Sequence, residues 1–246
     1  NDFWRYDPAT NQWTWMKGAN TAGDPGSYGT QGVPDPANNP PSRCETAAAW
    51  PDNSGNLWLF GGYNGATFND LWRYNIATNT WTWMKGSSTT NQPSVYGTLT
   101  VEGPANTPGA REAYAHWKDN NGNFWLFGGF VFSSGTPLND TWRYNPLTNN
   151  WTWMHGNVPA NYGTTCVSSA SNVPYGRHES RASWKDQNGN FWMFGGYNGS
   201  GMINDLWLYC LATNQWTWVS GDMTTNSPGN WGTINVPSPT NEPIAK

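Results

Sequence analysis

The chain has 246 residues, of which 11% are charged and 16% are aromatic, and 19 of them are Trp. This composition excludes wholesale disorder, because disordered chains are rich in charge and poor in aromatic residues. No run of 18 apolar residues is present to cross a bilayer as a helix. The net charge of −4, without a basic stretch, argues against a nucleic-acid partner bound through its phosphates.

The sequence repeats itself four times. Each copy opens with Asn-Asp and closes with Trp-Thr-Trp; the opening pairs are Asn1-Asp2, Asn69-Asp70, Asn139-Asp140 and Asn204-Asp205, and the closing motifs begin at Trp13, Trp81, Trp151 and Trp216. Three copies are preceded by an apolar run that ends in Gly-Gly, namely Leu57–Gly62, Phe124–Gly129 and Phe191–Gly196. Before each run stand Arg, Glu, small residues and Trp. A long repeat of this kind governs the fold prediction.

Each complete copy predicts four short strands. In the first, a strand over Glu45–Trp50 is joined by the turn Asp52–Asn56 to an apolar strand over Leu57–Phe60. An alternating strand then places Asp70, Trp72 and Tyr74 on one face, and a turn ending in Asn79 leads to Trp-Thr-Trp. No long stretch has the helical periodicity of apolar residues, because Gly and Pro residues interrupt the sequence. The prediction is an all-β fold built from four-stranded propeller blades.

The repeat resembles the kelch repeat. In the three complete copies a Gly-Gly doublet precedes a Tyr, and in all four copies a Trp follows that Tyr after six intervening residues; the pairs are Tyr6/Trp13, Tyr74/Trp81, Tyr144/Trp151 and Tyr209/Trp216. The resemblance implies a β-propeller of the galactose oxidase and kelch superfamily, closed in most members by six or seven blades. It also resembles long-connection repeats of secreted or surface proteins of bacteria. The copper constellation of galactose oxidase cannot be mapped here, so the resemblance carries the fold and not the reaction, and no cofactor is expected.

The repeat frame predicts one propeller domain of three complete blades and a half blade. Its parts are residues 1–42 (half blade and connection), 43–110, 111–176 and 177–246, because Ile244-Ala245-Lys246 aligns with the residues before the next first strand. We expect either a piece of a longer propeller or completion by another copy, since open strand edges favour pairing. A start at Asn1 agrees with a leader that is absent or removed.

Long connections of similar sequence join the blades: residues 18–42 (first), 86–110 (second), 156–176 (third) and 221–246 (terminal). They share a Tyr-Gly-Thr column at Tyr28, Tyr96 and Tyr162, in which Trp231 replaces Tyr. A second column is assigned to Asn39-Pro40, Asn106-x-Pro108, Asn172-x-Pro174 and Asn241-x-Pro243. Repeated connections of this length predict a structural role, folding back over the blade edges.

Most candidate residues are expected to serve the fold. The columnar Trp residues should fill the gaps between blades, and the recurring charged residues should pair or cap loops: Arg43, Arg111, Arg177, Glu45, Glu112, Glu179, Asp2, Asp70, Asp140 and Asp205. The three glutamates are also ligand-binding candidates. His116, His155 and His178 lack metal-ligand spacing, the Asp-x-x-Gly-Asn motifs favour turns over calcium loops, and Cys44, Cys166 and Cys210 form no disulfide framework.

Variable positions carry the remaining functional hypotheses. Tyr114, His116 and Arg181 lie where an innermost strand would line a central channel, and Tyr28, Tyr96, Tyr162 and Trp231 could stack on sugars. We therefore expect a non-catalytic binding or structural module, extracellular or at the cell surface, with a protein or glycan partner or a second copy. The alternatives are a carbohydrate-binding module and an enzyme that uses the channel residues.

Overall fold

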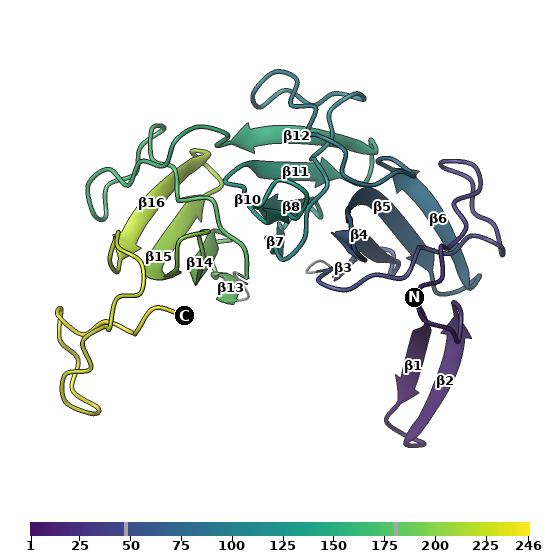
Figure 1. Cartoon of the computed structure of the whole chain (residues 1–246), viewed down its shortest axis with the longest axis horizontal. Coiled ribbons are helices and arrows are strands. Elements are labelled where there is room, and N and C mark those ends of the chain that lie inside the picture. The colour runs from purple at the N-terminus through teal and green to yellow at the C-terminus, as the bar shows by residue number, and fades with distance from the viewer. Residues whose placement is uncertain (47–48, 180–181) are drawn as a thin grey trace. The chain divides into compact units, whose positions relative to one another are not determined.

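A computed structural model describes residues 1–46, 49–179 and 182–246, and these residues are all-β (Figure 1). Within them no helix has the length and apolarity needed to cross a membrane. The chain forms two compact units. The first holds residues 1–94 and 109–112, and the second holds residues 95–108 and 113–246.

The first unit contains a two-stranded hairpin and a four-stranded sheet. The hairpin pairs β1 (Phe3–Asp7) with β2 (Gln12–Lys17). The sheet has the antiparallel order β3-β4-β5-β6, with bounds Ala49–Pro51, Leu57–Tyr63, Thr67–Asn75 and Thr80–Lys85. The predicted half blade and the predicted four-stranded blade are therefore present in this order.

The second unit contains two four-stranded sheets. One has the order β12-β11-β8-β7, with bounds Asn150–His155, Thr141–Asn145, Phe124–Phe127 and Ala115–Lys118. A small hairpin of β9 (Phe130–Val131) and β10 (Thr136–Pro137) extends from it. The other sheet has the order β13-β14-β15-β16, with bounds Ala182–Lys185, Phe191–Tyr197, Met202–Cys210 and Gln215–Ser220.

Aspartate organises the turn between the first two strands of each blade. Asp52 Oδ1 accepts the amide hydrogens of Ser54 and Asn56, and Asp52 Oδ2 accepts the Trp58 indole N–H at 2.9 Å. Gly55 supplies the positive φ of 81° that the turn requires. Asp119 and Asp186 repeat this pattern, so these motifs are turns, as predicted.

The conserved spacing of Tyr and Trp in the last hairpin of each blade also has a local cause. The turn residue Asn79 has a φ of 54°, a left-handed conformation that asparagine tolerates. Its side-chain oxygen accepts the Tyr74 hydroxyl at 2.6 Å. The hairpins of β1–β2, β11–β12 and β15–β16 contain the same bond, so the tyrosine fixes the turn.

Sheets pack face to face inside each unit. In the first unit, Phe3 of the hairpin contacts the rings of Tyr74 and Trp81 at 4.6 and 5.9 Å. In the second unit, Phe127 contacts Trp216 at 5.0 Å, and Trp117 stacks on Phe191 at 5.1 Å. Trp81, Trp117 and Trp216 of the three complete blades thus fill gaps between sheets.

Two details of the predicted repeat are wrong. The asparagine column contains Asn38 and not Asn39, because Asn38 Nδ2 donates to the Val33 and Trp81 carbonyls as its counterparts do in the other connections. The glutamate column is also misaligned. Positive φ values at Glu45, Ala113 and Glu179 mark equivalent positions, so Glu112 stands one residue earlier. A one-residue deletion before β7 conceals this shift.

Candidate functional site

The first three connections are each anchored by a buried aspartate of the blade that follows. Asp70 accepts two hydrogen bonds from Arg43, at 2.5 and 2.7 Å, one from the Tyr28 hydroxyl at 2.6 Å and one from the Trp72 indole at 2.8 Å. In the second unit Asp205 receives the equivalent bonds from Arg177, Tyr162 and Trp207. The prediction that recurring charges pair is confirmed for both Arg–Asp pairs.

The electrostatics of the Asp205 cluster follow from burial and pairing. Burial alone would raise the pKa of the Asp205 carboxyl, but Arg177 and the two neutral donors hold that pKa below its ordinary value. Burial, followed by the Asp205 charge, raises the pKa of the Tyr162 hydroxyl. The aspartate is therefore ionised and the tyrosine is a neutral donor at neutral pH.

The connection tyrosines wedge between two indoles of the next blade. The Tyr28 ring lies 5.0 Å from Trp72 and 5.1 Å from Trp83. Tyr96 packs in the same way on Trp142 and Trp153 and donates to Asp140, and Tyr162 packs on Trp207 and Trp218. Rings and hydroxyls of these three candidates are used inside the protein, and their role in sugar binding stays a prediction.

Main-chain bonds complete the contact between connection and blade. Asn38 Nδ2 donates to the Trp81 carbonyl at 3.1 Å, and the Gly32 amide donates to the Trp83 carbonyl at 2.8 Å. The second connection repeats both bonds through Asn106 and Thr100, and the third through Asn172 and Cys166. We call this recurring set of contacts the connection–blade contact.

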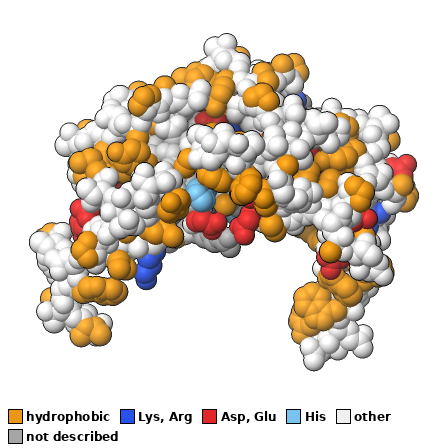
Figure 2. Space-filling view, in the orientation of Figure 1, with side chains coloured by type: hydrophobic (Ala, Val, Ile, Leu, Met, Phe, Trp, Pro, Cys, Tyr) orange, Lys and Arg blue, Asp and Glu red, His pale blue; other side chains and the backbone are white. Residues whose placement is uncertain are grey.

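The β1–β2 hairpin presents the same surface uncovered. We call the side chains of Trp4, Tyr6, Trp13 and Trp15 the hairpin face; they are 47%, 44%, 65% and 47% exposed, whereas their counterparts Trp72, Tyr74 and Trp81 are buried. Hydrophobic side chains gather on this hairpin in Figure 2. The prediction that columnar Trp residues are buried between blades is wrong for this hairpin and for Trp184, which is also exposed.

The terminal connection carries another exposed aromatic residue. Trp231, which occupies the tyrosine column, is 73% exposed. Lys246 occupies the arginine column, because its carbonyl accepts the Gly196 amide just as the carbonyls of Arg111 and Arg177 accept those of Gly62 and Gly129. The predicted alignment of the terminal residues is thus confirmed.

The remaining candidates lie apart from this surface. Tyr114 is buried, and His116 is half-buried on β7, where burial lowers its imidazole pKa. Arg181 lies outside the described residues. Glu45 and Glu179 are exposed, and Glu112 is buried. As ligand-binding residues all six stay predictions.

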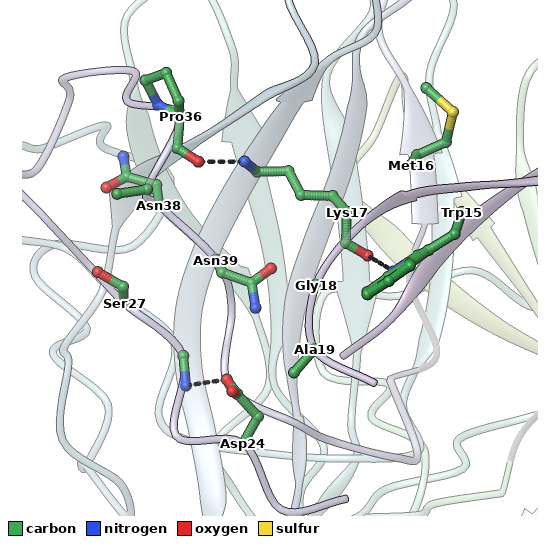
Figure 3. Close-up of a pocket in the computed structure, with 12 residues that line it drawn as sticks. Trp15, Met16, Lys17, Gly18, Ala19, Asp24, Ser27, Pro36, Asn38 and Asn39 are labelled. Atoms are coloured by element: carbon green, nitrogen blue, oxygen red, sulfur yellow. Dashed lines mark hydrogen bonds between the residues drawn. The ribbon is translucent and has the colours of Figure 1, made fainter. Parts of the chain in front are cut away.

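A pocket of about 570 Å³ lies beside the hairpin face in the first unit (Figure 3). It is lined by Trp15, Lys17, Asp24 and Asn39, among others. The Trp15 indole donates to the Lys17 carbonyl at 2.8 Å, and the Lys17 ammonium donates to the Pro36 carbonyl. The pocket combines an exposed indole with hydrogen-bonding groups.

Among the described residues, no group of three or more His, Cys, Asp and Glu is placed to hold a metal ion. Cys44, Cys166 and Cys210 are free thiols.

Two segments of the chain, residues 54–82 and 120–152, match the family model described as the Kelch motif. These two segments are kelch motifs, and they support a kelch-repeat β-propeller. Both segments contain the Gly-Gly doublet, the tyrosine and the first Trp of the closing motif, which are the residues that carried the predicted resemblance. The four-stranded sheets are blades of the kelch propeller type.

Similar proteins agree with this assignment. The chain is 28% identical to Kelch domain-containing protein 10 of Xenopus laevis over 172 residues, covering 66% of this chain and 34% of that protein. It is similar in structure to YjhT, with a TM-score of 0.51 and 15% identity, covering 76% of this chain and 55% of YjhT. The second likeness bears on the fold alone. The chain spans about a third of the length of the relative and about half of the solved structure.

The hairpin face is the feature that sequence reasoning missed. Its residues are equivalent in the repeat to aromatic residues of the complete blades, and the repeat alignment alone therefore predicts that they are buried. The available signal was positional: each covered indole pair is preceded by a connection with the Tyr-Gly-Thr motif, and within residues 1–246 that motif first occurs at Tyr28, after the hairpin.

Proposed function

We propose that this kelch chain is a non-catalytic binding and structural module of a secreted or cell-surface bacterial protein, and that it assembles with copies of itself through exposed blade surfaces. The observation that carries the proposal is the hairpin face, where four aromatic side chains of one blade surface are 44–65% exposed. Contiguous apolar surface of this kind marks interaction sites, and aromatic residues dominate binding energy at interfaces.

The non-catalytic part of the proposal rests on how the recurring charges are used. Arg43 and Asp70, and likewise Arg177 and Asp205, form doubly hydrogen-bonded pairs whose side chains are almost completely buried. A catalytic acid or base must reach the substrate proton that it transfers. These carboxylates instead accept hydrogen bonds from their own connection and blade.

The extracellular location is supported by composition. Charged residues make up 11% of the chain, and Gly, Pro and Trp are abundant. Labelling of intact source cells with a membrane-impermeant reagent tests it: labelling of the protein supports a surface location, and labelling only after lysis contradicts it.

Self-association is tested by sedimentation velocity on residues 1–246 over a wide range of protein concentration. The proposal predicts a weight-average sedimentation coefficient that rises with concentration. A coefficient that stays at the monomer value at every concentration contradicts the assembly function.

Glycan binding is a second candidate function, favoured by the pocket beside Trp15. An exposed indole can stack on a sugar ring while Asp24 and Asn39 supply hydrogen-bond partners. Tryptophan fluorescence titration with a panel of sugars tests it, with Trp15→Ala as the site variant. A saturable response that is lost in Trp15→Ala supports this function, and no response to any sugar contradicts it.

A further inference from the structure

The connection–blade contact occurs three times in the chain, and the surfaces that would form a fourth are both exposed. On one side is the hairpin face with Asp2, which stands in the aspartate column. On the other side is the terminal connection with Trp231. Both surfaces contain hydrogen bonds that recur in the formed contacts.

The hairpin face is preorganised. The Trp4 indole donates to Asp2 Oδ2 at 2.6 Å, as the Trp72 indole donates to Asp70 Oδ2 at 2.8 Å. The Trp15 indole donates to the Lys17 carbonyl at 2.8 Å, as the indole of Trp83 donates to Lys85 at 2.9 Å. The two indoles that receive the connection tyrosine in a complete blade therefore make equivalent hydrogen bonds here, and the Trp4 and Trp15 rings stack on each other at 6.3 Å.

The terminal connection is preorganised as well. The Val236 amide donates to the Thr233 carbonyl at 3.0 Å, and Asn241 Nδ2 donates to the Val236 carbonyl at 2.9 Å. Val33, Thr30 and Asn38 make the same two bonds in the first connection; Asn235 has a φ of 63°, like Thr100 in the second. Because these hydrogen bonds are formed in advance, docking has fewer groups to order, which favours affinity.

The chemistry of the two surfaces is complementary. The Trp231 indole has an apolar ring to pack against Trp4 and Trp15, and an N–H that can replace the tyrosine hydroxyl as a donor to Asp2. Lys246, in the arginine column, brings a positive charge to the same carboxylate. By the repeat register, Asn241 Nδ2 and the Asn235 amide face the Trp13 and Trp15 carbonyls.

We propose that the terminal connection of one copy docks on the hairpin face of a second copy and forms a fourth connection–blade contact. This inference rests on the proposed function and names the surfaces through which the copies assemble. Residues 1–246 of each copy contain one hairpin face and one terminal connection, so the proposed interface is head-to-tail and, between copies of this segment, leads to a closed ring or a filament.

Two variants that each block one side test the proposal. Trp231→Asp removes the wedge from the terminal connection, and Trp15→Asp places a charge in the hairpin face. Each variant alone should associate at least about tenfold more weakly than the parent chain, because a central aromatic residue dominates such an interface. Leu147→Asp, at a turn residue that is 93% exposed, is the matched control and should associate like the parent.

Mixing the two variants is the decisive step. Trp231→Asp keeps an intact hairpin face and Trp15→Asp keeps an intact terminal connection, so an equimolar mixture should form heterodimers and stop there. Heterodimer formation also shows that both variants are folded. Association of the single variants at parental strength, or a mixture that stays monomeric, overturns the proposed surfaces while self-association of the parent stands. A parent chain that is monomeric at every concentration overturns the assembly function itself.

Discussion

Replacement of Asp205 by alanine tests whether the buried aspartate holds a connection to its blade. Arg177 and Asp205 are fully buried, and removing one partner of a buried ion pair leaves an uncompensated charge, at a cost of about 3–5 kcal/mol. The substitution also deprives the Tyr162 hydroxyl and the Trp207 indole of their acceptor. The free energy of unfolding of Asp205→Ala should therefore fall by about 3–5 kcal/mol, the two neutral donors placing it toward the upper end.

Asp2→Ala is the matched control, because Asp2 stands in the same sequence column but is exposed and accepts a hydrogen bond from Trp4 at the surface. Urea unfolding followed by tryptophan fluorescence measures both variants, at a protein concentration low enough to avoid association. We expect no measurable change for Asp2→Ala. Equal losses of unfolding free energy in the two variants would refute the reasoning, because the contribution of the aspartate would then not depend on its burial.

Three further predictions concern the same contacts. Tyr162→Phe keeps the ring and removes the hydroxyl that donates to the buried aspartate, so urea unfolding should show a loss of about 1–3 kcal/mol; an unchanged midpoint would contradict this bond. Gly86→Ala places a Cβ 2.1 Å from a main-chain oxygen, whereas Gly135→Ala has the same left-handed backbone but open space, so the first variant should be the less stable by thermal unfolding. Burial lowers the pKa of the His155 imidazole in the folded protein below its unfolded value near 6.5, so protonation favours the unfolded chain and the free energy of unfolding falls as the pH drops below that value. His155→Gln should flatten this decline in the free energy of unfolding, and an unaltered pH profile would count against it.

The blades themselves could be predicted from the sequence because their determinants are local. The turn at Asp52–Asn56, the left-handed Asn79 and the Tyr74 bond to it all lie within a few residues of one another. Periodic apolar residues then set which face of each strand is buried. Each repeat contains such local patterns, so the four copies predict the same fold.

The candidate site could not be predicted in the same way, because its properties depend on neighbours distant in the chain. Trp4 and Trp72 occupy one column, yet only Trp72 receives a tyrosine from a preceding connection. The alignment of Glu112 failed for a related reason: the backbone conformation, and not the residue type, marks the equivalent position at Ala113. The repeat columns identify the equivalent aromatic residues, and the contacts between connection and blade determine which of these residues are exposed.

Hydrogen exchange of the terminal connection tests the central claim most directly. In the three formed contacts, the amides of Gly32, Thr100 and Cys166 donate to a blade carbonyl, and Asn235 is their counterpart. Mass spectrometry of a peptide that contains Asn235 should show exchange that slows as protein concentration rises and recovers on dilution, with no such slowing in Trp15→Asp. Exchange that is independent of concentration, or slowing that persists in that variant, would contradict docking of the terminal connection on the hairpin face.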